Sequence, residues 1–219
     1  MLVLYFLIVH SPKSKSQQVD ARARQALLDA LTEFSQLSGH PEIEGAPLVF
    51  WGMSAGGQFG YEFACWRPER VVTFIVNKGG TYYTALAPEA TRRIPCLIFM
   101  GERDIDFRKN ILKGIFSLNR RAGALWSFIE EPDATHEVRR SIEVSEAFYD
   151  EVILLRLPDS SQSTEGAVTL RDLDLKDGLL GDLEELTYGP YDQVQAAKKP
   201  MAWLLNEKVA LTWKAMARG

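Results

Sequence analysis

Cysteine is scarce in this sequence, and the scarcity limits what kind of protein it can be. The 219 residues include only Cys65 and Cys96, and both stand inside apolar stretches. Two such residues cannot form the disulfide framework that is typical of small secreted domains. We therefore interpret them as reduced core residues and expect a cytoplasmic location.

The sequence also lacks an excess of positive charge and any long hydrophobic run. The formal net charge is −4 and the isoelectric point is about 5.5, which argues against nucleic acid or an anionic membrane as a partner. The opening MLVLYFLIV is too short to span a bilayer, has no basic leader and is followed by polar residues without a cleavage pattern. We expect this segment to be a buried strand.

The composition that is present fits a globular protein. Apolar residues make up 46% of the chain and charged residues 25%, so the chain can bury a full hydrophobic core in one domain, or in one domain with an appendage.

Apolar runs and helical patterns alternate along the first 155 residues. The runs are short enough for buried strands, and they are Leu2–Val9, Leu48–Trp51, Val71–Val76, Cys96–Met100 and Leu125–Ile129. The segments between and after them have helical spacing, and they are Ala21–Leu37, Gly57–Trp66, Phe107–Arg121 and Ser141–Leu155. This alternation predicts an α/β fold, a three-layer sandwich in which helices cover both faces of a mainly parallel sheet of about five strands.

The stretch FWGMSAGG suggests a site at the end of one strand. Gly52, Ser54 and Gly56 have the spacing G-x-S-x-G, in which a strand turns sharply into a helix and leaves the serine at the apex. Small neighbours are needed there because strand and helix approach closely. Ser54 is therefore the candidate nucleophile.

A nucleophilic serine needs a base and an acid that orients the base. The chain has three histidines. We interpret His10 and His40 as surface residues, whereas His136 lies in a loop just after a predicted strand, where a sheet presents catalytic groups. Asp104 follows the strand before it, and Asp106 is the alternative acid.

Together these segments resemble the α/β-hydrolase superfamily. GMSAGG is similar to its nucleophile elbow, PCLIFMGERD to the strand and turn that carry its acid, and DATHE to the loop that carries its histidine. The resemblance covers roughly residues 20–155 and implies Ser54 as nucleophile, Asp104 as acid and His136 as base. Within the superfamily, GMSAGGQFGYEFACWRPERV is most similar to small esterases of the dienelactone-hydrolase and polyester-depolymerase kind.

The sequence departs from this family in the segment that precedes Ser54. Only one predicted strand and one helix precede Ser54, so the strand whose loop completes the oxyanion hole in the family has no counterpart. The N–H of Ala55 is the expected oxyanion donor. A second donor is either missing or supplied by the backbone of His10–Ser11, and the exposed sheet edge invites a homodimer.

The segment after the third predicted strand is too short for a helical cap, so we expect an open pocket. Tyr82 and Tyr83 are candidates to line it, because amphipathic rings suit a half-wet cleft, although packing on the sheet rim explains them equally well. Lys78 is interpreted as a solvated charge.

The last part of the chain breaks the alternation. We expect a catalytic domain over residues 1–155 and a C-terminal extension over residues 156–219 that packs on it. Asp172, Asp174 and Asp177 resemble a calcium loop only in outline, because the spacing and the closing glutamate are wrong. No metal and no cofactor are expected. The final amphipathic helix packs on the domain or, alternatively, binds a partner.

Two hypotheses for function follow. The first is a serine hydrolase that cleaves a small or accessible ester through an acyl-enzyme. The second is a relative that keeps these residues but has lost the oxyanion architecture, and serves as a binding or assembly module.

Overall fold

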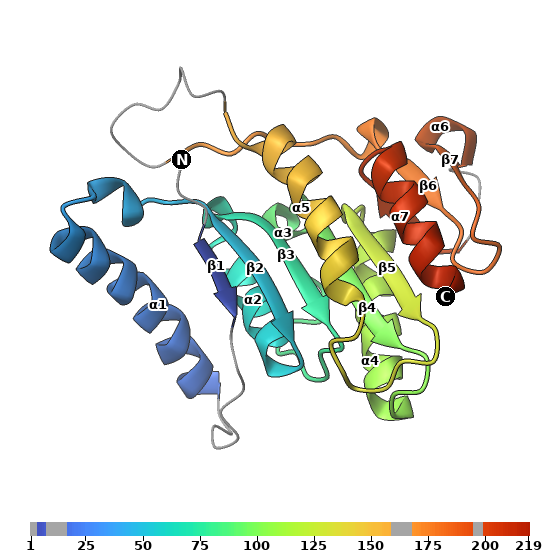
Figure 1. The fold of residues 1–219 in the computed structure, drawn as a ribbon, viewed down its shortest axis with the longest axis horizontal. Coiled ribbons are helices and arrows are strands. Elements are labelled where there is room, and N and C mark those ends of the chain that lie inside the picture. The colour runs from blue at the N-terminus through green and yellow to red at the C-terminus, as the bar shows by residue number, and fades with distance from the viewer. Residues whose placement is uncertain (1–3, 8–16, 159–167, 195–198) are drawn as a thin grey trace.

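The centre of the molecule is a sheet of five parallel strands. The computed structural model describes residues 4–7, 17–158, 168–194 and 199–219. The strands are β1 (Leu4–Leu7), β2 (Leu48–Met53), β3 (Val71–Asn77), β4 (Cys96–Gly101) and β5 (Trp126–Glu131). They lie side by side in chain order (Figure 1). The predicted α/β class and its mainly parallel sheet are confirmed.

Strands β2, β3, β4 and β5 each contribute side chains to two separate hydrophobic cores. Successive side chains of a strand point to opposite faces of the sheet, so Leu48 and Phe50 of β2 join one core while Val49 joins the other. Strands β3 and β4 are buried along their whole length. Both faces of the sheet are therefore covered, which explains why these strands appear in the sequence as continuous apolar runs.

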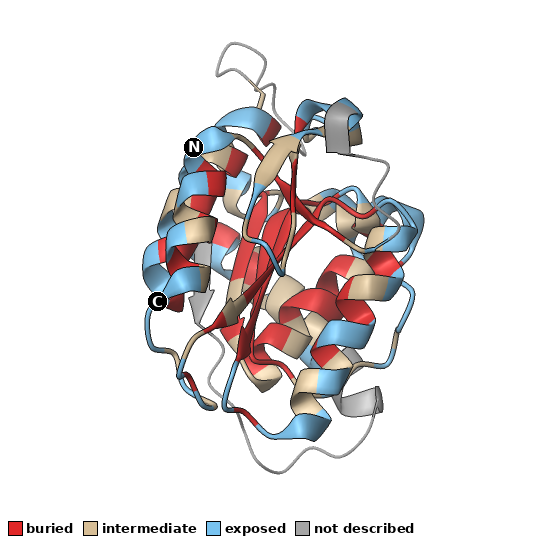
Figure 2. Cartoon of the chain, turned by 90° about the vertical axis from the view of Figure 1, so that its right-hand side faces the viewer, coloured by how far each residue is buried: buried red, intermediate tan, exposed pale blue. Residues whose placement is uncertain are grey.

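Helices form a layer on each face. On one face lie α1 (Gln17–Ser38), α2 (Ala55–Trp66) and α4 (Asp106–Arg121), and on the other α5 (Ser141–Arg156) and α7 (Glu207–Arg218). Figure 2 shows the buried strands between these layers, whose outer sides are exposed. The short helices are α3 (Glu89–Arg92), α6 (Tyr191–Val194), η1 (Pro41–Ile43), η2 (Pro68–Arg70) and η4 (Leu175–Asp177).

The C-terminal segment joins the core of the larger sheet. It forms a small antiparallel sheet of β6 (Leu179–Gly181), β7 (Tyr188–Pro190) and β8 (Ala202–Leu204), in the order β7-β6-β8, followed by α7. Trp203 and Trp213 are each 1% exposed and belong to the same core as Val49. The indole Nε1 of Trp213 donates to the carbonyl of Phe128 on β5 at 2.7 Å. The amphipathic pattern of α7 is thus used for packing within the chain, while the domain boundary at residue 155 stays a prediction.

Two aspartates of the calcium-like stretch, Asp174 and Asp177, cap a turn. The Asp174 carboxylate accepts from the N–H of Lys176 at 2.9 Å, and the Asp177 carboxylate accepts from the N–H of Asp174 at 3.1 Å. This reciprocal capping gives Asp174 and Asp177 a structural role in the turn. Within the described ranges, no helix is both long and apolar enough to cross a membrane.

Candidate active site

Ser54 occupies a sharp turn between β2 and α2. Its backbone has φ 54° and ψ −120°, a conformation that side-chain-bearing residues rarely adopt. Its N–H donates to the carbonyl of Asn77 on β3 at 2.8 Å, and its carbonyl accepts from the N–H of Gln58 at 3.2 Å. The serine is therefore held at the carboxyl end of β2 by bonds to the neighbouring strand and to the following helix.

The close approach of strand and helix requires the glycines around this turn. A Cβ on Gly52 would lie 2.1 Å from the backbone carbon of Gly56, and a Cβ on Gly57 would lie 2.7 Å from the carbonyl oxygen of Gly52. Neither position tolerates a methyl group unless the backbone moves. The turn has the geometry that the G-x-S-x-G spacing predicts.

Asp104 and His136 meet although 32 residues separate them. Asp104 follows β4, His136 lies in the loop after β5, and His136 Nδ1 is 3.2 Å from Asp104 Oδ2. Backbone bonds join the two loops, since Arg103 N–H donates to the carbonyl of Ala134 at 2.9 Å. A Cβ on Gly101 would lie 2.5 Å from the carbonyl oxygen of Thr135, so the loops pack too closely for a larger residue.

The alternative acid, Asp106, lies away from this pair. Its side chain is 89% exposed at the start of α4 and pairs with Lys109 at 3.0 Å, whereas the side chain of Asp104 is 2% exposed. Of the two aspartates, the structure thus brings Asp104 to His136.

Arg108 is a second partner of Asp104, and it was not expected from the sequence. Its Nε lies 2.9 Å from Oδ2 and its Nη2 lies 2.9 Å from Oδ1, so the contact is bidentate. Burial raises the pKa of Asp104, but hydrogen bonds from Arg108, the Ile105 N–H and His136 outweigh this effect and hold the pKa below its ordinary value. The spacing of four residues at the start of α4 was the available signal.

The base and the nucleophile are not hydrogen-bonded to each other. Among the described residues, the Oγ of Ser54 makes no hydrogen bond, and the imidazole of His136 bonds only to Asp104. Ser54 and His136 are the partners expected from the sequence, so this contact differs from the expectation. Catalytic contacts are often long in the absence of substrate and tighten when it binds.

Ala55 is the first residue of α2, and its N–H has no carbonyl partner within the helix. The helix dipole places partial positive charge at this end. Strand β1 is parallel to β2, with Leu7 opposite Trp51, so its carboxyl end points to the same edge as Ser54. The expected second oxyanion donor, His10–Ser11, lies outside the described residues.

Tyr82 and Tyr83 have different environments. The ring of Tyr82 packs edge-on against that of Tyr61, with centroids 5.0 Å apart, and burial raises the pKa of its hydroxyl. Tyr83 is 46% exposed, while its N–H donates to the buried carboxylate of Glu62 at 2.7 Å. Packing thus accounts for Tyr82, and a substrate contact by either ring stays a prediction.

Lys78 is not a solvated charge, and that interpretation was wrong. Its side chain is fully buried, and its Nζ donates to Glu131 Oε2 at 2.5 Å and to Asn77 Oδ1 at 3.1 Å. The backbone of Lys78 has φ 53°, so the chain turns sharply just past the end of β3. A partner on β5, 53 residues away, satisfies the ammonium group and gives no signal in the local sequence.

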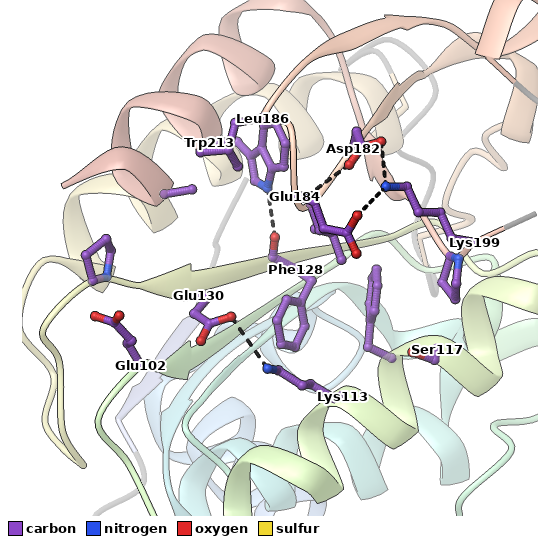
Figure 3. A pocket seen from close by; sticks show the side chains of 15 residues that line it. Glu102, Lys113, Ser117, Phe128, Glu130, Asp182, Glu184, Leu186, Lys199 and Trp213 are labelled. Atoms are coloured by element: carbon purple, nitrogen blue, oxygen red, sulfur yellow. Dashed lines mark hydrogen bonds and ion pairs between the residues drawn. The ribbon is translucent and has the colours of Figure 1, made fainter. Parts of the chain in front are cut away.

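A cavity of about 540 Å³ lies elsewhere, between α4, β5 and the C-terminal segment (Figure 3). Its lysines are paired, since Lys113 lies 3.6 Å from Glu130 and Lys199 lies 2.7 Å from Glu184. Ser54, Asp104 and His136 do not line it. We therefore do not assign it to the candidate site.

Comparisons with known proteins concern the fold. No family model matches the chain, and no curated protein matches it. Among solved structures, a variant of SOBER1 from Arabidopsis thaliana is 18% identical with a TM-score of 0.43, and the match covers 59% of this chain and 66% of that chain. An apo form of ESTFA that lacks FE is 11% identical with a TM-score of 0.42, covering 65% of this chain and 59% of that one. This chain spans less than two thirds of either structure.

The fold is α/β-hydrolase-like. This assignment rests on the parallel sheet and its strand order, on the serine turn after β2, and on the acid and histidine loops that follow β4 and β5. In the described residues, the five parallel strands are followed by a C-terminal segment that packs on the same sheet.

Proposed function

We propose that the chain is a serine hydrolase of the carboxylesterase type that cleaves a small or accessible ester. Ser54 is the nucleophile, His136 the general base and Asp104 the group that orients it. The single observation that carries this proposal is the strained turn at Ser54 on the same sheet edge as the Asp104–His136 pair. Strained backbone at a serine is typical of activated nucleophiles.

The reaction has two halves. Ser54 Oγ attacks the ester carbonyl carbon while His136 Nε2 takes the hydroxyl proton, and Asp104 accepts from Nδ1–H and stabilises the imidazolium. The Ala55 N–H stabilises the oxyanion. The alcohol then leaves with the proton from His136, and a water molecule, deprotonated by the same imidazole, hydrolyses the acyl-enzyme and regenerates Ser54.

One observation favours a second candidate, a binding or assembly module without catalysis. Arg108 already compensates the charge of Asp104, and its two contacts at 2.9 Å are shorter than the 3.2 Å contact to His136. In this reading the Asp104–Arg108 pair stabilises the first turn of α4, and His136 is an accessory partner.

A fluorophosphonate probe separates the two candidates, because it labels a serine only when a base activates it. We expect labelling of the wild type that Ser54→Ala and His136→Ala abolish. Ser38→Ala and His40→Ala are matched controls at exposed positions and should label normally. A folded wild-type sample that remains unlabelled would favour the binding module.

A further inference from the structure

A buried ion pair joins the carboxyl ends of β3 and β5, at the same edge of the sheet as the candidate site. The side chains of Lys78 and Glu131 are 0% and 2% exposed, and their Nζ–Oε2 distance is 2.5 Å. Removing two charges from water is unfavourable unless further hydrogen bonds satisfy them. The additional partners of this pair are therefore informative, because they show what its charges are used for.

Glu131 connects both ends of the loop that carries His136. It is the last residue of β5, and its backbone carbonyl accepts from the N–H of Glu102 at 3.1 Å. Glu102 lies in the turn after β4 that carries Asp104. Its second carboxylate oxygen accepts from the N–H of Arg140 at 3.0 Å, just before α5 begins. The carboxylate thus closes the loop 132–140 at its base.

Asn77 connects this loop to the serine turn. Its backbone carbonyl accepts from the N–H of Ser54 at 2.8 Å, and its side-chain oxygen accepts from Lys78 Nζ at 3.1 Å. Its Nδ2 donates to the Oγ of Ser141, the first residue of α5, at 2.8 Å. The Ser141 hydroxyl in turn donates to the carbonyl of Val138, two residues beyond His136, at 2.7 Å.

We propose that Asn77, Lys78, Glu131 and Ser141 form a positioning network that sets the His136 loop relative to the Ser54 turn. The inference rests on the proposed function, because positioning matters only if His136 serves Ser54. None of the four is a catalytic residue, and they act through the backbone of the two loops. All four are nearly completely buried, so the network behaves as one unit between the nucleophile and its base.

The network makes the rate of the chemical step sensitive to residues that never touch substrate. A displacement of about 1 Å between reacting groups can lower turnover about 100-fold. Loss of a network bond should therefore lower kcat and leave KM nearly unchanged, because the surface that binds the ester is intact.

Two serines on the same helix provide a matched test. Ser141→Ala removes the hydroxyl that joins Asn77 to Val138, and Ser145→Ala removes an equally buried hydroxyl one turn later, which donates only to the carbonyl of Ser141 at 2.6 Å. We expect Ser141→Ala to lower kcat about 10- to 100-fold with KM within about twofold. Ser145→Ala should keep both constants near those of the wild type.

The ion pair is tested by removing both charges together, because a single substitution leaves an unpaired buried charge and can prevent folding. Lys78→Met/Glu131→Leu should fold and show the kcat defect of Ser141→Ala. Hydrogen exchange of the amides in residues 132–140 is measured in parallel, and it should be faster in both network variants than in Ser145→Ala.

The outcomes distinguish this inference from the proposed function. Equal kcat values and equal loop exchange in Ser141→Ala and Ser145→Ala would overturn the network, even if the wild type is an active hydrolase. An unlabelled and inactive wild type would overturn the proposed function and, with it, the catalytic use of the network. If the wild type is inactive and the network variants still exchange faster at residues 132–140, the network only stabilises the loop. This outcome would also count against the proposal.

Discussion

Asp104→Asn is the substitution that most sharply tests the roles of the buried acid. The carboxylate contacts His136 Nδ1 at 3.2 Å, Arg108 at 2.9 Å and the N–H of Ile105 at 2.8 Å. Asparagine has one acceptor oxygen and one amide nitrogen that only donates. If the oxygen stays with Arg108 and Ile105, the amide faces Nδ1 and leaves the imidazole proton on Nε2, where it cannot accept from Ser54.

The magnitude follows from this change of tautomer. In a serine triad the same substitution lowers kcat by about 10⁴-fold, which at about 1.4 kcal/mol per tenfold corresponds to roughly 5.5 kcal/mol of lost transition-state stabilisation. We expect a loss of this order in the hydrolysis of p-nitrophenyl acetate. Asp106→Asn, at a side chain that is 89% exposed, should change the rate by no more than about twofold.

The reasoning is refuted if Asp104→Asn lowers stability but keeps turnover within tenfold of the wild type. The carboxylate would then serve Arg108 and the first turn of α4, as in the binding-module reading. Comparison with Arg108→Met makes this distinction, because that variant removes the guanidinium while the Asp104–His136 contact can persist.

The remaining predictions concern pH, packing and the turn. Because the pKa of Asp104 is depressed in the folded protein, its stabilising effect is present above the ordinary value of 3.8 and is lost as the pH falls below it. The difference in unfolding free energy between wild type and Asp104→Asn should therefore shrink in urea titrations as the pH is lowered through this range. Trp213→Ala should cost about 3–5 kcal/mol, whereas Leu211→Ala, 55% exposed on the same helix, should cost far less. Gly52→Ala places a methyl 2.1 Å from backbone and should abolish probe labelling, while Gly114→Ala, with open space around it, should raise the melting temperature slightly.

The parts of this molecule that the sequence predicts are those with a local cause. Buried parallel strands must be apolar on both faces, so β3 and β4 stand out as continuous hydrophobic runs. The serine turn is also local, because the contact between Gly52 and the start of α2 involves residues only a few positions apart. Such features need no knowledge of the rest of the fold.

The parts that were missed depend on distant residues or on a combination of local and distant ones. Lys78 is the type of residue that is usually solvated, and its partner Glu131 lies 53 residues away at the end of β5, on the other side of β4. The use of Arg108 was accessible through its spacing from Asp104, but the third member of this cluster, His136, lies on a loop 32 residues away from Asp104.

Two buried carboxylates distinguish the carboxyl edge of the sheet from its apolar interior. Asp104 and Glu131 lie at the carboxyl ends of adjacent strands, each is almost fully buried, and each is paired with a cation, Arg108 and Lys78 respectively. One carboxylate contacts the ring of His136 and the other contacts the backbone at the end of its loop. Hydrophobic residues would serve simple packing as well or better, because a buried ion pair is often no more stabilising than an apolar replacement. One carboxylate thus contacts the imidazole of His136 while the other holds the backbone at the end of its loop, and this division of roles favours the proposed hydrolase over the module without catalysis. If Ser141→Ala and Ser145→Ala are equally active, the Lys78–Glu131 pair serves folding alone and no longer favours the hydrolase.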